Sequence, residues 1–160
     1  MSDRIAIINR GRIEQLGDAP EIYHRPRTAF AADFIGQANL LHVAVTGRNG
    51  TTARVRLDHG LELTIASAEL PASAQSALVS IRPEKICISK VRMDSENVFA
   101  ARIEEEIFQG ATDQLRLVTE QGTRLNALVA NESAMQEAFH EGDQVWCGLH
   151  LDDVVIVQAE

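Results

Sequence analysis

Apolar and polar residues alternate along most of this chain in short runs, which is the pattern of β-strands rather than of long helices. The first two runs span residues 5–8 and 13–16, and Arg10-Gly11 lies between them. Two such runs around a glycine-containing turn predict a β-hairpin.

The stretch after this hairpin breaks the alternation and predicts two short helices. Asp18 can cap the first helix, Glu21 completes a capping-box pattern, and Pro26 ends it. Thr28 is the expected cap of the second helix, and Gly36 stands where a left-handed residue would end it. The two helices therefore form a joint between the hairpin and the rest of the chain.

Five strand-like runs follow the joint. They cover residues 40–47, 51–57, 61–65, 76–82 and 85–89. Asn49-Gly50, between the first two runs, is a hairpin signal because both residue types accept positive φ. Five short strands in about fifty residues are typical of a small barrel.

From Asn97 onward the chain repeats this order of runs, with a predicted helix over 131–140 before the last two strands. The ends of the halves align best: Ile81 falls over Leu149, Glu84 over Asp152, Ile86 over Val154 and Ile88 over Ile156. We predict two copies of one unit, packed as intertwined barrels. The alternative is that any two β-meanders show similar spacing.

The composition of the chain argues against some classes of function, such as nucleic-acid binding. The chain has 160 residues, of which 45% are hydrophobic, so it can bury a core. Its net charge of -8 and its 4% aromatic content argue against a nucleic-acid surface. The sequence has no apolar run of the roughly 20 residues that a spanning helix needs and no secretion signal, so we expect a cytoplasmic protein.

Candidate chemistry is sparse. Cys87 and Cys147 lie in apolar runs and are expected to be core thiols, not a disulfide or a metal pair. The five histidines lack metal-ligand spacing, so we expect no metal site. Glutamates 104–106 would alternate between strand faces, which favours a solvated edge over a carboxylate site. The aromatic residues are spaced like core residues: Phe99, Phe108, Phe139 and Trp146.

The start of the chain carries several elements with fixed spacing. These are Ser2-Asp3-Arg4, Gly11-Arg12-Ile13, Gln15 with Gly17, Tyr23 with Pro26, and Phe34-Ile35-Gly36 followed by Asn39. Together they resemble the end of the nucleotide-binding domain of ABC importer ATPases of the maltose, iron and polyamine type, at its crossing into the C-terminal domain. One proline departs from the family pattern, since it stands at Pro20, three residues after Gly17 instead of two.

The rest of the chain resembles the transport-associated OB region of the same family. The resemblance is carried by Ile81 to Glu84, by Phe108-Gln109-Gly110, by Asn126 to Val129 and by Glu141-Gly142-Asp143. It implies a mainly β fold: two OB-like barrels that form an internal repeat, preceded by a short hairpin and two short helices. It also implies a remnant of the nucleotide-binding domain at 1–36 and a regulatory domain at 37–160, with halves of about 37–92 and 93–160.

The resemblance points to candidate regulatory or interface residues, through which the domain would sense its dimer mate or a regulator. These are Arg82, Pro83, Glu84, Phe108 and Gly110. The structural alternative for the first three is a strand end with an exposed Arg82–Glu84 ion pair, which would contribute at most about 1 kcal/mol.

Neither lysine of the chain follows the glycines of a phosphate-binding loop, and the signature turn and the Mg-holding Asp-Glu pair of ABC ATPases are also missing. The resemblance implies that the chain begins just after a histidine that the family places upstream of its Ser-Asp-Arg. We therefore expect no catalytic, cofactor or metal site here. ATP and Mg²⁺ would bind elsewhere in a full-length parent.

The parent would be an importer subunit for a polyamine, a phosphonate or ferric ion. It would form a homodimer and reach the membrane permease, at the inner face of the cell membrane, through its nucleotide-binding domain. The alternative function is a small-oxyanion module, because related OB domains bind molybdate; the Ser-Ala-Arg-Asn entry of such modules is missing.

Overall fold

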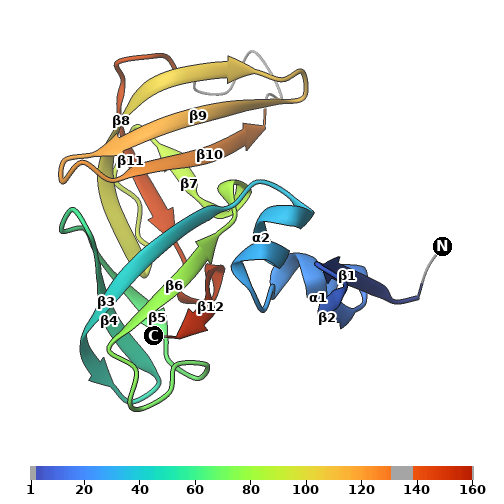
Figure 1. Ribbon diagram of the computed structural model, residues 1–160. Coiled ribbons are helices and arrows are strands. Elements are labelled where there is room, and N and C mark those ends of the chain that lie inside the picture. The colour runs from blue at the N-terminus through green and yellow to red at the C-terminus, as the bar shows by residue number, and fades with distance from the viewer. Residues whose placement is uncertain (1–2, 131–138, 160) are drawn as a thin grey trace.

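A computed structural model describes residues 3–130 and 139–159 of the chain. It begins with the expected hairpin, β1 (Ile5–Asn9) and β2 (Arg12–Gly17), followed by α1 (Ala19–His24) and α2 (Ala29–Ile35). Figure 1 shows this N-terminal unit beside the larger β-structure. The helix expected over 131–140 lies almost wholly outside the described residues.

Both helix caps are confirmed, whereas the expected helix end is not. Asp18 Oδ1 accepts a hydrogen bond from Glu21 N at 2.8 Å, and Thr28 Oγ1 accepts one from Ala31 N at 3.0 Å. Gly36 has φ of 169°, so it is extended instead of left-handed. The extended chain presents the Gly36 carbonyl to the guanidinium of Arg82 at 3.2 Å, which explains the departure.

The β-structure consists of two antiparallel five-stranded sheets (Figure 1). The first sheet has the order β12-β6-β3-β4-β5 and the second has the order β10-β9-β8-β11-β7. In chain order the strands and 3-10 turns are β3 (Asn39–Asn49), β4 (Thr52–Leu57), β5 (Glu62–Ala66), β6 (Ser76–Ile81), η1 (Pro83–Lys85), β7 (Cys87–Ser89), β8 (Asn97–Phe108), β9 (Thr112–Thr119), β10 (Arg124–Ala130), β11 (Gln144–Leu149), η2 (Leu151–Asp153) and β12 (Val154–Ala159).

Each sheet takes one edge strand from the other half of the chain. β7 pairs with β11, and β12 pairs with β6. The same exchange in both directions makes the two halves intertwined, as the sequence predicts. The buried side chains of both sheets form one continuous core, which includes Val55, Ile65, Ile103 and Leu117.

The strand registers confirm the internal repeat. Asn39 pairs with Ile81 at the start of β3, and Asn97 pairs with Leu149 at the start of β8. A β-bulge interrupts the β3–β4 pairing between Val45 and Gly47, and another interrupts the β8–β9 pairing between Ile103 and Glu105. Because a bulge is a specific local feature, its presence at the same place in both halves argues against a chance likeness of two meanders.

Two local expectations are wrong. Asn49 does not adopt positive φ, because it continues β3, and Gly50 alone carries the turn with φ of 61°. Phe108 is 71% exposed and is no core residue. The bulge after Ile103 shifts the phase of β8, and the end of the β8–β9 hairpin extends past the core.

The two cysteines differ in environment, although both were expected in the core. Cys147 is buried, whereas Cys87 on the short edge strand β7 is exposed. Burial raises the pKa of the Cys147 thiol to about 12, so this thiol stays protonated and unreactive near neutral pH.

We therefore expect a thiol reagent such as Ellman's reagent to titrate one thiol of the native chain at pH 8 and both thiols in denaturant. A Cys87→Ser variant should show almost no reaction until it is unfolded. Fast reaction of the native Cys87→Ser variant would contradict the buried position of Cys147.

Candidate functional site

Arg82 connects the N-terminal helices to the barrels. Its side chain follows the end of β6 and is only 6% exposed. The guanidinium donates five hydrogen bonds to four backbone carbonyls of the joint. The acceptors are Tyr23 O at 3.3 and 3.1 Å, Ala32 O at 3.2 Å, Gly36 O at 3.2 Å and Gln37 O at 3.1 Å. The guanidinium carbon also lies 4.6 Å from the centroid of the Tyr23 ring, a cation–π contact.

This geometry corrects the expectation of an exposed Arg82–Glu84 ion pair. The guanidinium faces backbone carbonyls and an aromatic ring, and Glu84 instead accepts a hydrogen bond from the Tyr23 hydroxyl. The pKa of Tyr23 is raised, mainly by burial and then by the hydrogen bond to Glu84 and the negative charge of Glu84. The positive charge of Arg82 lowers this pKa and so opposes the rise. Arg82 and Glu84 thus both contact Tyr23, from neighbouring positions of the first barrel.

The other candidate residues lie in two places. Pro83 is buried and begins η1, directly after Arg82. Phe108 and Gly110 lie at the turn between β8 and β9, where Gly110 has φ of 88°. Figure 1 shows this turn at the end of the second sheet, away from the joint. The structure therefore groups Arg82, Pro83 and Glu84 and leaves the other two on a separate hairpin tip.

Two asparagines, Asn39 and Asn97, join the two barrels through hydrogen bonds that the sequence does not predict. Asn39 Nδ2 donates to Asn126 O at 2.9 Å, and Asn39 Oδ1 accepts from Asn126 N at 2.8 Å. Asn97 makes the same pair of bonds with Thr64, at 2.8 and 2.7 Å. Each side chain therefore pairs with the free backbone of an edge strand in the opposite barrel. In the sequence, the only sign of these contacts is that β3 and β8 each begin with an asparagine.

Within the N-terminal unit, the side chain of Gln15 connects the hairpin to the link between the two helices. It is 3% exposed. Its side-chain amide donates to Arg25 O at 3.1 Å, and its side-chain oxygen accepts from Arg27 N at 2.9 Å. Side-chain-to-backbone hydrogen bonds thus connect the hairpin to the link between the two helices, through Gln15, and the helices to the barrels, through Arg82.

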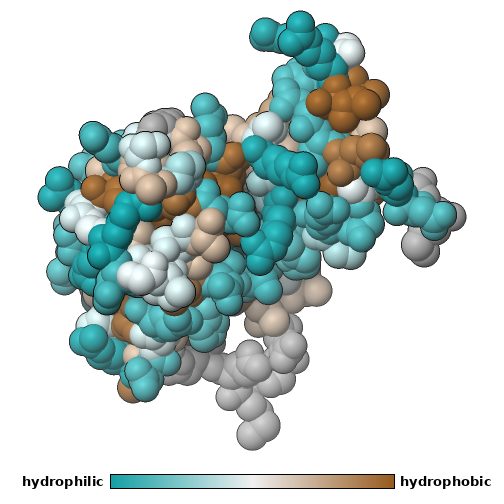
Figure 2. Space-filling model, turned by 90° about the horizontal axis from the view of Figure 1, so that it is seen from below, coloured by the Kyte–Doolittle hydropathy of each residue, from teal (hydrophilic) through white to brown (hydrophobic). Residues whose placement is uncertain are grey.

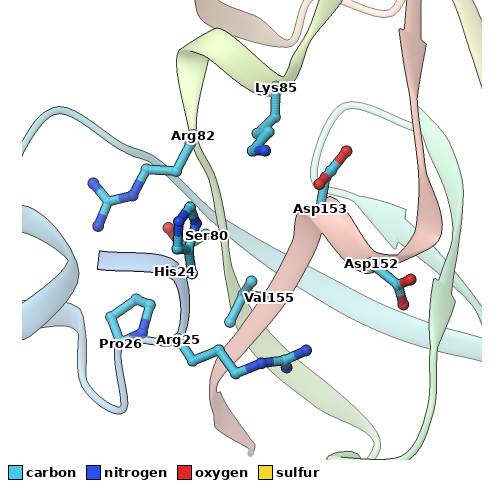
Figure 3. A pocket seen from close by; sticks show the side chains of 9 residues that line it. All are labelled: His24, Arg25, Pro26, Ser80, Arg82, Lys85, Asp152, Asp153 and Val155. Atoms are coloured by element: carbon cyan, nitrogen blue, oxygen red, sulfur yellow. The ribbon is translucent and has the colours of Figure 1, made fainter. Parts of the chain in front are cut away.

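A small cavity of about 100 Å³ opens beside the joint (Figure 3). Its walls come from α1 and the following link, from β6 with η1, and from η2 with β12. Polar and charged side chains dominate the lining: His24, Arg25, Ser80, Arg82, Lys85, Asp152 and Asp153. Figure 3 shows the Arg82 guanidinium turned away from Lys85 and Asp153, toward the helices.

Other candidate chemistry is limited. Within residues 3–130 and 139–159, no group of three or more His, Cys, Asp or Glu side chains is placed to hold a metal ion. Glu104, Glu105 and Glu106 each face a different partner, Arg124, Arg116 and His140 respectively, so they form no joint carboxylate site. None of the helices in the described part is long and apolar enough to cross a membrane.

Comparison with known proteins assigns the second half of the sequence to a domain type. Residues 79–157 match the model of the TOBE domain. By fold, the chain is similar to the cytoplasmic molybdate-binding protein ModG, with a TM-score of 0.63 over 74% of this chain and 94% of that one. The sequence identity of 12% makes this a likeness of fold alone.

Several curated relatives are similar over most of the chain, and all are spermidine/putrescine import ATP-binding proteins PotA. The protein of Roseobacter denitrificans is 40% identical over 76% of this chain. PotA 2 of Pseudomonas aeruginosa is 38% identical over 99%, and the protein of Thermobifida fusca is 36% identical over 91%. The chain spans 33%, 45% and 38% of these relatives, respectively, and so less than half of their length. The TOBE match and the homology over most of the chain place this protein in the family of ABC importer ATP-binding proteins.

Proposed function

We propose that this chain is the regulatory domain of the ATP-hydrolysing subunit of a bacterial importer, together with a remnant of the adjoining nucleotide-binding domain. The remnant is residues 1–36 and the regulatory domain is residues 37–160. The observation that carries the proposal is the buried Arg82, whose hydrogen bonds connect the two parts. A connection of this kind can transmit a change in one part to the other, because breaking it leaves several carbonyls unpaired.

The surface of the N-terminal unit supports an adjoining domain. Ile7 packs with Ile22 and Ala31 in a small core of its own, but Ile8 and Ile13 on the same hairpin are 61% and 64% exposed. Phe30 and Phe34 stack on each other at 5.8 Å between ring centroids, and Phe34 is 66% exposed. Figure 2 shows hydrophobic side chains at the surface of this end of the molecule. We propose that the rest of the nucleotide-binding domain covers them.

The same proposal assigns the chemistry and the partners. ATP and Mg²⁺ bind to the rest of the full-length subunit, and the residues of this chain do not act on them. The subunit functions as a homodimer and contacts the membrane permease through its nucleotide-binding domain, at the cytoplasmic face. Among the solutes considered, a polyamine is favoured, because the similar relatives are named as spermidine/putrescine import proteins.

The test is a full-length subunit that ends at residue 36 of the present numbering, compared with the intact subunit. We expect both proteins to bind Mg-ATP with similar affinity in calorimetry, and the truncated one to differ at least about twofold in its ATPase rate or dimerisation. Equal rates and equal association of the two proteins would contradict a regulatory role. The isolated chain should give no heat of binding with Mg-ATP up to millimolar concentration.

The exposed hairpin gives a further expected result. The hairpin packs on the helices through Ile7 but leaves Ile8 and Ile13 exposed, and exposed strand edges pair with other chains. We therefore expect the isolated chain to self-associate through residues up to about Leu16, while a version that begins at Arg27 stays monomeric in light scattering. If both versions show the same dimer, the contact belongs to the barrels and the hairpin plays no part in it.

The second candidate function is a small-oxyanion module, and the fold likeness to ModG gives it weak support. Equilibrium dialysis against molybdate and tungstate separates the two functions. Saturable binding of either anion by the isolated chain would favour the oxyanion module.

A further inference from the structure

We propose that the cavity beside the joint binds a small zwitterion of the α-amino acid type. The cavity of about 100 Å³ is smaller than the roughly 300 Å³ at which pockets for drug-sized ligands begin, so it suits a ligand of a few heavy atoms. Three separate segments of the chain supply its walls: α1 with the following link, β6 with η1, and η2 with β12. A ligand there would contact the joint and the start of the exchanged strand β12.

The charges around the cavity are mixed and unpaired. Arg25 and Lys85 line it with Asp152 and Asp153, and in the described part of the chain none of these four side chains forms an ion pair. Figure 3 shows Lys85 extending from η1 on one side of the cavity and Asp153 rising from the turn before β12 on the other. Opposite charges held apart across a small space match a ligand that carries both an ammonium and a carboxylate group.

Ser80 supplies a neutral polar group at the wall. The residue is 3% exposed and lines the cavity. A serine hydroxyl at a cavity wall can donate a hydrogen bond to a ligand oxygen. We assign the ligand carboxylate to Ser80 and Lys85, and the ligand ammonium group to Asp153.

The balance of charge disfavours the other small ligands. A diamine would place one ammonium group near Lys85 or Arg25, and a multiply charged oxyanion would meet Asp152 and Asp153. A neighbouring hollow of about 290 Å³ shares Arg25, Asp152 and Val155 with the cavity. It offers space along β12 for the side chain of an amino acid.

The experiment is calorimetric titration of the isolated chain with L-alanine, at constant ionic strength, beside two matched compounds that each lack one charge. We expect saturable binding of L-alanine, and at least tenfold weaker binding of L-alanine amide, which lacks the carboxylate, and of N-acetyl-L-alanine, which lacks the ammonium group. The variants Ser80→Ala and Asp153→Asn should each weaken L-alanine binding at least tenfold. The matched control Glu62→Gln, at an exposed position of β5, should leave it unchanged.

Three results would overturn the proposal: no binding of L-alanine, equal binding of N-acetyl-L-alanine or phosphate, or equal binding of putrescine. Equal binding of N-acetyl-L-alanine or phosphate would identify an anion pocket, and equal binding of putrescine would identify a diamine pocket. Melting curves of each variant without ligand separate lost binding from lost folding. The test uses the isolated chain, so a negative result leaves the proposed regulation of the ATPase untouched.

Discussion

Replacing Arg82 with alanine should release the N-terminal helices from the barrels. The variant removes all five hydrogen bonds of the guanidinium and leaves the carbonyls of Tyr23, Ala32, Gly36 and Gln37 without this donor. A buried polar group that loses its partner costs about 1–3 kcal/mol, and bonds to charged groups are stronger, so we expect a loss of about 2–4 kcal/mol for docking of the helices. Limited trypsin digestion measures this, because it reports cleavage after Arg27 when the joint opens.

We expect cleavage after Arg27 to be at least tenfold faster in Arg82→Ala than in the unmodified chain, while the barrels keep their near-native circular dichroism. Arg82→Lys should be intermediate, since one ammonium group cannot reach four carbonyls. Arg54→Ala is the matched surface control: its side chain is 58% exposed and pairs with Glu62, so its loss should cost at most about 1 kcal/mol. Equal protease resistance of Arg82→Ala and Arg54→Ala would show that the Arg82 contacts do not hold the joint.

The second large effect is expected at the two asparagines between the barrels. Asn39→Ala and Asn97→Ala each leave a backbone N–H and a backbone C=O of an edge strand unpaired, at Asn126 and at Thr64. Both asparagines are 6% exposed, so water replaces the lost bonds poorly. We expect each variant to lower the free energy of unfolding by about 2 kcal/mol in urea denaturation.

The double variant should lose about the sum of the two single effects, because the two sites share no partner and independent sites add to within about 0.5 kcal/mol. Gln144→Ala, an exposed position on β11, is the control and should change stability little. A loss below about 0.5 kcal/mol for either single variant would mean that the reciprocal pairs do not hold the barrels together.

Local features of this fold could be predicted because short-range chemistry decides them. The caps at Asp18 and Thr28 depend on a side chain and a backbone N–H three residues away, and both form. The alignment of Ile81 with Leu149 also holds, since each pairs with the asparagine that opens its sheet's long strand. Alternating burial repeats with a period of two, so it marks the strands wherever their partners lie.

Long-range choices could not be predicted in the same way. The sequence predicts intertwined barrels but not which strands are exchanged, because the exchange of β7 and β12 leaves the alternation of each strand unchanged. The partners of Arg82 are backbone carbonyls, which every residue has, and only the fold brings four of them to one guanidinium. The extended Gly36 could not be predicted for the same reason, because its carbonyl accepts a hydrogen bond from Arg82, which is distant in sequence.

The candidate site was predicted in part. Arg82, Pro83 and Glu84 do lie together at the joint, whereas Phe108 and Gly110 lie at a distant hairpin tip. The contact of Glu84 with Tyr23 spans sixty-one positions of sequence and has no local signal. Whether these residues regulate an ATPase stays a prediction.

The most direct test of that prediction is the ATPase rate of the full-length subunit that carries Arg82→Ala, measured with trypsin digestion of the same protein and with calorimetric binding of Mg-ATP. We predict an opened joint and an unchanged ATP affinity. We also predict that the ATPase rate, or its response to regulators, differs at least about threefold from that of the unmodified subunit. An opened joint with an unchanged rate and unchanged response would contradict the claim that this connection transmits regulation.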